Sequence, residues 1–244
     1  MPGTATAGAG HEYGAPVATP DQPQGDDPAY LEPHWPIALV LSLYIALTIV
    51  LRVVEPHAEE LRNRWVVPGI EIALFVSLLA SDPLRVHRRS VWARRIALAL
   101  VLMLVVVALV STTVLVTDLI RGGKVTQSAT SLLASGVLIW LGNCLVFGLL
   151  YWLLDSGGPR ARYLHERRYA DFAFTQQLSP ELAPPGWRPR YVDYLILGVT
   201  TSTAFSPTDV MPMAAWAKLT MALQSIVSLL VIGLVIARAV NVFT

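Results

Sequence analysis

Five long apolar runs divide the chain, and short charged segments separate them. Each run is close to the length of about 20 residues that a helix needs to cross the hydrocarbon core of a bilayer. The runs are Pro36 to Val54, Trp65 to Ala80, Ile96 to Thr117, Ser131 to Leu154 and Ala214 to Val240. This pattern predicts an all-α fold, a polytopic transmembrane helical bundle with five spans. The second run is the shortest, which fits a helix that is little tilted or lies inside the bundle.

A shorter apolar run precedes the last span and leads into a hydroxyl-rich segment. The run begins near Tyr191, and the segment Thr200 to Asp209 follows it. Pro207 in this segment removes a backbone donor and stops a helix. Non-helical backbone at bilayer depth is tolerated only where it is buried in protein or lines a wet cavity. The order predicts a short re-entrant or pore-type helix, although the run Tyr191 to Phe205 can also be read as a sixth crossing.

The loop after this short helix is the predicted filter, because carbonyl and hydroxyl oxygens can replace the water of an ion. The residues assigned to it are Thr200, Thr201, Ser202, Thr203, Phe205, Ser206, Thr208 and Asp209.

Several of these residues resemble the pore signature of tetrameric cation channels. The likeness is carried by Thr200-Thr201, by Asp209 to Pro212, and by Trp216 and Lys218 at the start of the last span. The two filter glycines of the channel pattern are absent, and seven residues separate Thr201 from Asp209, a longer spacing than in the channels. The resemblance implies a pore loop between an outer and an inner helix, and a homo-oligomer around the pore.

The same part of the chain is similar to a family of uncharacterised bacterial integral-membrane proteins. The strings that carry this likeness are Asp193 to Leu195, Ala204 to Asp209, Trp216 to Lys218, Gln224-Ser225 and Ala237 to Asn241. This resemblance implies a bacterial inner membrane and no particular activity.

Composition and charge agree with a membrane protein. Hydrophobic residues make up 54% of the chain and charged residues 14%, against about 25% charged in an average soluble domain. The net charge of +1 provides no global field for nucleic acid. Eleven arginines lie in the loops after the second and fourth runs, and five basic residues lie on the opposite side. The positive-inside rule therefore predicts a cytoplasmic N-terminus, which conflicts with the extracellular entry of a potassium-channel pore helix.

Four polar residues inside the predicted spans are candidates for a pathway. Glu71 is a possible proton or cation site, because intramembrane carboxylates are costly to bury, or it is a carboxyl paired with Arg64. Gln224 and Ser228 are spaced i, i+4 and form one polar stripe, which either lines a pore or packs against a neighbouring helix. Asn143 is open to the same two interpretations.

Four further residues are expected to support the loop. Asp193 falls in the first turn of the short helix, where a carboxylate suits the helix dipole and free N–H groups. Pro212 and Trp216 flank the start of the last span. Asp209 is expected to pair with Lys218 across the loop or with an arginine of another subunit.

Motifs for catalysis are missing from the sequence. There is no H-E-x-x-H, G-x-S-x-G, C-x-x-C or phosphate-binding loop. The sequence predicts no enzyme activity, no catalytic residues, no metal and no cofactor. A lipid-modifying membrane enzyme is the weakest of the function classes considered, and its activity would depend on Asp193 or Asp209.

We expect three parts: a disordered tail over 1–33, a three-helix membrane segment over 34–130, and a pore-like segment over 131–244. The predicted function is a channel-like integral membrane protein that conducts inorganic ions across the lipid bilayer. The alternative is a secondary transporter or a non-conducting membrane subunit, in which the same loop is a break at a substrate site.

Overall fold

The computed structural model describes residues 35–54, 69, 72–73, 76, 91–121, 129–163, 169–203 and 210–243. These residues all fall in one compact unit, 33–244. Its elements, in chain order, are α1 (Trp35–Val54), α3 (Val91–Arg121), α4 (Ala129–Leu154), η3 (Asp155–Gly157), α5 (Pro159–Tyr163), β1 (Phe172–Phe174), α6 (Thr175–Leu178), η4 (Pro180–Leu182), α7 (Tyr191–Ser202), β2 (Val210–Pro212) and α8 (Ala215–Phe243). The predicted tail and Glu71 lie outside the described residues.

Three of the described helices are long and apolar enough to cross a membrane. They cover Arg95–Arg121, Leu132–Gly157 and Ala215–Arg238, while the apolar part of α1, Ala38–Val50, is shorter. The described residues therefore carry three of the five predicted spans, and most of the run from Trp65 to Ala80 lies outside them.

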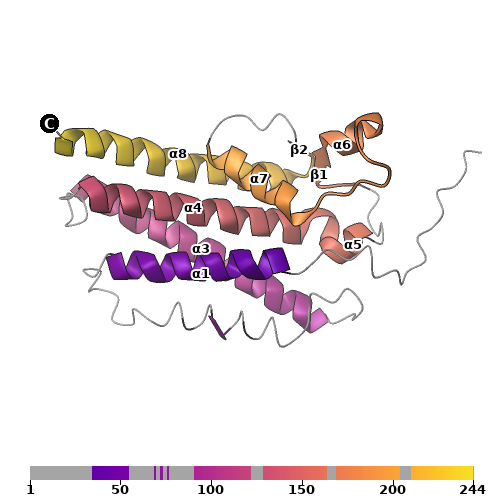
Figure 1. Ribbon diagram of the computed structural model, residues 1–244, viewed down its shortest axis with the longest axis horizontal. Coiled ribbons are helices and arrows are strands. Elements are labelled where there is room, and N and C mark those ends of the chain that lie inside the picture. The colour runs from indigo at the N-terminus through magenta and orange to yellow at the C-terminus, as the bar shows by residue number, and fades with distance from the viewer. Residues whose placement is uncertain are drawn as a thin grey trace, which may run out of the picture. The chain divides into compact units, whose positions relative to one another are not determined.

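Helix α4 lies at the centre of the bundle, against α1, α3, α7 and α8 (Figure 1). In the most apolar stretch of α4, 72% of the residues are buried inside the protein, against 33% in each of the other two candidate spans. An apolar helix that is surrounded on most sides needs no amphipathic pattern, because nearly every face meets another apolar surface.

The described fold is mostly helical, as predicted, and also contains a two-stranded antiparallel sheet that the sequence did not predict. Phe172 pairs with Pro212, and Phe174 pairs with Val210. Phe172 and Phe174 are buried, with Ala173 between them half-buried, so the alternation of a strand places both rings on the core side. The segment between α4 and α7, expected to be an arginine-rich loop, thus contains ordered elements that hold α7.

The buried apolar residues form two separate clusters. The larger cluster unites α1, α3, α4 and α7 with both strands and the start of α8. The smaller cluster lies toward the other end of the three long helices, and its members are Leu115, Leu119, Leu132, Ile139, Val231 and Val235.

Candidate functional site

Helix α7 enters the bundle and ends inside it. At about 1.5 Å per residue, its 12 residues span about 18 Å, well short of the roughly 30 Å hydrocarbon core. Tyr191 at its start lies against Trp152 near the end of α4. Ser202 at its end accepts a 3.4 Å hydrogen bond from the indole N–H of Trp140, three turns back along α4.

The chain after α7 returns to the end of the bundle from which α7 entered. Strand β2 pairs with β1, and Phe172 of β1 packs edge-to-face on Tyr151 near the end of α4. Trp216, at the start of α8, packs on the same Phe172 ring. The start of α7 and strand β2 therefore lie at the same end of α4, as Figure 1 shows, while the last residue of α7 lies deep in the bundle beside Trp140.

The C-terminal carbonyls of α7 are all hydrogen-bonded. A buried helix end exposes its last four C=O groups, and in a membrane these groups need donors from the protein. Gln224 Nε2 donates to the carbonyl of Gly198, and the Trp140 indole donates to that of Ser202. The N–H of Thr203 donates to the carbonyl of Val199, and its hydroxyl donates to that of Thr200. The Ser225 hydroxyl donates to the carbonyl of Thr201. Side chains of α4 and α8 therefore cap this helix end.

Gln224 is the centre of this cap. It is fully buried, and its Oε1 accepts a 2.6 Å hydrogen bond from the Tyr151 hydroxyl. Its Nε2 donates to the Gly198 carbonyl at 2.8 Å and to Ser202 Oγ at 2.7 Å. We call these four residues the Gln224 network. It joins α4, α7 and α8 at the depth where α7 ends, so Gln224 lies in a helix-packing interface.

Two glycines let α7 approach α4 closely. A Cβ atom on Gly198 would lie 2.6 Å from the Cys144 carbonyl oxygen and 3.1 Å from the Gly148 nitrogen. A Cβ on Gly148 would lie 3.1 Å from the Leu195 Cα. Because these neighbours are backbone atoms, they can yield only if the helices separate.

Substituting Gly198 with alanine should therefore lower the free energy of unfolding by about 1–3 kcal/mol, the usual cost of overpacking. The matched control is Gly233→Ala on α8, where a Cβ meets no atom within 4 Å and should be neutral or slightly stabilising. Reversible unfolding in detergent micelles would measure both variants. Equal effects of the two substitutions would contradict the close crossing of α4 and α7.

A second polar group, the Asp155 cluster, fixes the end of the bundle from which α7 enters. Asp155 is 1% exposed and follows the last residue of α4. Its Oδ1 accepts bonds from the Ser156 hydroxyl at 2.9 Å and from the N–H groups of Asp171 and Phe172 at 3.2 and 3.3 Å. Its Oδ2 accepts the hydroxyl of Tyr194 at 2.5 Å. One carboxylate thus connects the end of α4 to β1 and to the first turns of α7.

Asp171 and Arg162 complete the cluster. Asp171 Oδ2 accepts the Ser156 N–H at 2.8 Å, which holds Ser156 at a φ of 53° in the left-handed region. Arg162 donates to the carbonyls of Trp152 and Asp155 at 2.6 and 2.9 Å. Its guanidinium lies 4.9 Å from the Tyr194 ring centroid, within the range of a cation–π contact.

The first turn of α7 contains the expected carboxylate cap. Asp193 Oδ2 accepts a 2.7 Å bond from the Arg190 N–H. Burial raises the pKa of the Asp193 carboxyl, while this hydrogen bond and the Arg190 charge oppose the rise. The role is local to the helix start and needs no substrate.

The other candidates fall at separate places. Thr200, Thr201 and Ser202 form the last turn of α7, with Thr203 as its C-cap; Phe205, Ser206, Thr208 and Asp209 lie outside the described residues, as does the expected Asp209–Lys218 pair. Pro212 pairs with Phe172, and Lys218 is exposed on α8. Asn143 and Ser228 are fully buried inside the bundle.

The sequence reasoning missed Asp155, Asp171, Tyr151 and Tyr194. The only local signal was the string Asp155-Ser156-Gly157-Gly158, whose last three residues all have positive φ, a conformation that favours glycine. Among the described residues, no group of three His, Cys, Asp or Glu side chains could hold a metal ion.

Comparison of this chain with protein-family models, curated proteins and solved structures gave no match.

Proposed function

We propose that the chain is a channel-type membrane protein in which α4, α7 and α8 form the pore unit, with the segment after α7 as its conducting surface. The observation that supports the proposal is that the short helix α7 ends inside the bundle, against the two long apolar helices α4 and α8. A helix that ends inside the bilayer leaves non-helical backbone at depth, and such backbone is tolerated where it lines a wet cavity or is buried in protein.

The direction of α7 favours cations. Its C-terminal end, which carries the negative end of the helix dipole, points into the bundle at the level of Trp140. The hydroxyls of Thr200 to Thr203 and the oxygens of 204–209 follow at this end, and such oxygens can replace the water of a cation. Because the backbone carbonyls of residues 198 to 202 are bonded inside the protomer, the conducting oxygens would be the side-chain hydroxyls at this end and the oxygens of the residues that follow, between copies of a homo-oligomer in the bacterial inner membrane.

Ion flux through the purified protein in liposomes tests this proposal. We expect passive K⁺ or Na⁺ flux under a concentration gradient, with selectivity changed in Asp209→Asn and in a Thr200→Ala, Thr201→Ala double variant. Loss of one oxygen contact worth about 1 kcal/mol would shift the K⁺/Na⁺ ratio about fivefold.

The control is Thr113→Ala, an exposed residue on α3 whose hydroxyl bonds only to the Leu109 carbonyl of its own helix. It should conduct like the wild type. Absence of Na⁺, K⁺ and Cl⁻ flux in protein that is folded and correctly inserted would contradict a channel.

The second candidate is a secondary transporter or a non-conducting membrane subunit. The complete capping of the α7 carbonyls supports it, because a sealed helix end also suits a structural break. Glu71→Gln separates the two functions: it should abolish proton-coupled uptake in a transporter and leave passive flux through a pore intact.

A further inference from the structure

Buried polar residues lie between the two apolar clusters on every helix that passes through both. On α3, Thr112 lies between Leu104 of the larger cluster and Leu115 of the smaller one. On α4, Asn143 lies between Leu145 and Ile139 in the same way. The end of α7 reaches this level through Ser202. We define the mid-bundle polar layer as Thr112, Asn143, Thr201, Ser202, Gln224 and Ser228, all of them buried.

Polar contacts join the layer across four helices. Asn143 Nδ2 lies 3.5 Å from Thr112 Oγ1, which joins α4 to α3. Gln224 joins α8 to α7 through Ser202. The Trp140 indole joins α4 to α7 through the Ser202 carbonyl, and Cys144 is the chain neighbour of Asn143. Cys144 is the only cysteine of the chain and is 1% exposed.

Three atoms of the layer have no hydrogen-bond partner among the described residues: Asn143 Oδ1, Thr201 Oγ1 and Ser228 Oγ. Their side chains are 0%, 2% and 0% exposed. Leaving a buried polar group unpaired costs about 1–3 kcal/mol, and native proteins usually meet such groups with ordered water. These atoms are half of the six buried unpaired side-chain atoms in the described part of the chain, and all three belong to residues between the two apolar clusters.

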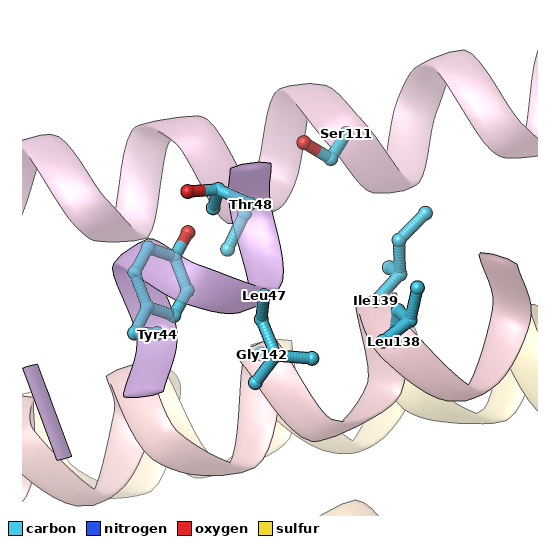
Figure 2. Close-up of a pocket in the computed structure, with 8 residues that line it drawn as sticks. Tyr44, Leu47, Thr48, Ser111, Leu138, Ile139 and Gly142 are labelled. Atoms are coloured by element: carbon cyan, nitrogen blue, oxygen red, sulfur yellow. The ribbon is translucent and has the colours of Figure 1, made fainter. Parts of the chain in front are cut away.

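The bundle contains a small crevice, whose lining residues Figure 2 shows. It has a volume of about 20 Å³ and lies between α1, α3 and α4. Its lining includes Ser111 and Gly142, the chain neighbours of Thr112 and Asn143. About 10–15 Å³ is enough for one water molecule, so this crevice, which is lined by the chain neighbours of Thr112 and Asn143, has room for water.

We propose that the mid-bundle polar layer binds ordered water in the interior of the bundle. The guest is neutral because none of the six layer residues is charged, and an uncompensated ion at this depth would be costly. Water can donate to Asn143 Oδ1 and accept from the two hydroxyls. This proposal does not depend on ion conduction, because bound water would lie beside the capped end of α7 in a channel and in a transporter alike.

Radiolytic hydroxyl labelling of the protein in liposomes, read by mass spectrometry, tests the proposal, because radicals form from water bound beside a side chain. Each rate is divided by the rate of the same residue in the denatured chain. We expect Cys144 to be labelled at least tenfold more readily, on this scale, than Phe147, which is 0% exposed in the larger apolar cluster. An Asn143→Leu, Ser228→Ala double variant should lose most of the Cys144 labelling.

Equal protection of Cys144 and Phe147 in the wild type would overturn the proposal, and this comparison needs no variant to fold. A rise in the unfolding temperature with Na⁺ or K⁺ but not with choline, abolished by Asn143→Leu, would also overturn it, because the guest would then be a cation. The labelling result is independent of the flux result, so either proposal can fail alone.

Discussion

Replacing Gln224 with leucine is expected to lower the free energy of unfolding by about 3 kcal/mol. Hydropathy alone predicts the opposite, because leucine is among the most favourable residues in a membrane helix. In this structure, however, the change leaves the Tyr151 hydroxyl, the Gly198 carbonyl and the Ser202 hydroxyl without their Gln224 bonds. Each unpaired buried group costs about 1–3 kcal/mol, and bonds between membrane helices lie at the low end of that range. Reversible unfolding in detergent micelles, followed by tryptophan fluorescence, would measure the loss.

A double-mutant cycle shows whether the network accounts for this effect. Tyr151→Phe should cost about 1 kcal/mol in the wild type and almost nothing in Gln224→Leu, because the hydroxyl has already lost its partner. Ile226 lies on the same helix and is 58% exposed. Ile226→Ala therefore serves as the control and should change stability little. A stable Gln224→Leu protein with additive effects of the two substitutions would contradict the role given to Gln224.

The features that sequence reasoning predicted correctly depend on residues that are close along the chain. Long apolar runs predicted α3, α4 and α8 because the length needed to span hydrocarbon is a local property. The short helix before the last span was also expected, and α7 has Asp193 in its first turn. A capping carboxylate acts within one turn, so its position is readable without any tertiary contact.

The features that the sequence did not disclose connect distant positions. Phe174 pairs with Val210 across a stretch that contains α7, and nothing in the three-residue strands distinguishes them from loops. In the sequence, Asp155 is simply the first charged residue after an apolar run. In the structure, it accepts a hydrogen bond from the hydroxyl of Tyr194, 39 residues away. The position of α7 beside β2 at one end of α4 follows from these long-range contacts, so the sequence left the apolar run around α7 open to two topologies.

The polar stripe on α8 shows where sequence reasoning reaches its limit. The i, i+4 spacing of Gln224 and Ser228 establishes that both lie on one helix face, and such a face can line a pore or pack against a neighbour. In the structure, Gln224 is fully bonded to α4 and α7, while Ser228 Oγ has no partner among the described residues. Two residues of one stripe therefore have different surroundings, which only the neighbouring helices determine.

Replacing Asp155 with alanine is expected to have the largest effect, a loss of about 4 kcal/mol. The carboxylate accepts bonds from two hydroxyls and two backbone N–H groups, and each buried donor left without an acceptor costs about 1–3 kcal/mol. Since these donors belong to the end of α4, to β1 and its flank, and to α7, the loss should also loosen the base of α7. Limited proteolysis should then cut the segment between α4 and α7 faster, and unfolding in micelles would measure the stability.

Asp155→Asn separates hydrogen bonding from charge in this cluster. Asparagine keeps an oxygen for the Asp171 and Phe172 N–H groups, so it should cost about 2 kcal/mol, roughly half the effect of alanine. Glu181→Ala, on the exposed turn η4, is the control for a lost carboxylate in the same segment and should change neither readout. Arg162 Nη1 is as far as 4.0 Å from Asp155 Oδ2, whereas its short hydrogen bonds are to the carbonyls of Trp152 and Asp155. The ion pair is therefore the weaker part of the cluster. If asparagine proved as damaging as alanine, the charge on Asp155 would be what holds α7 in place, and its hydrogen bonds would be secondary.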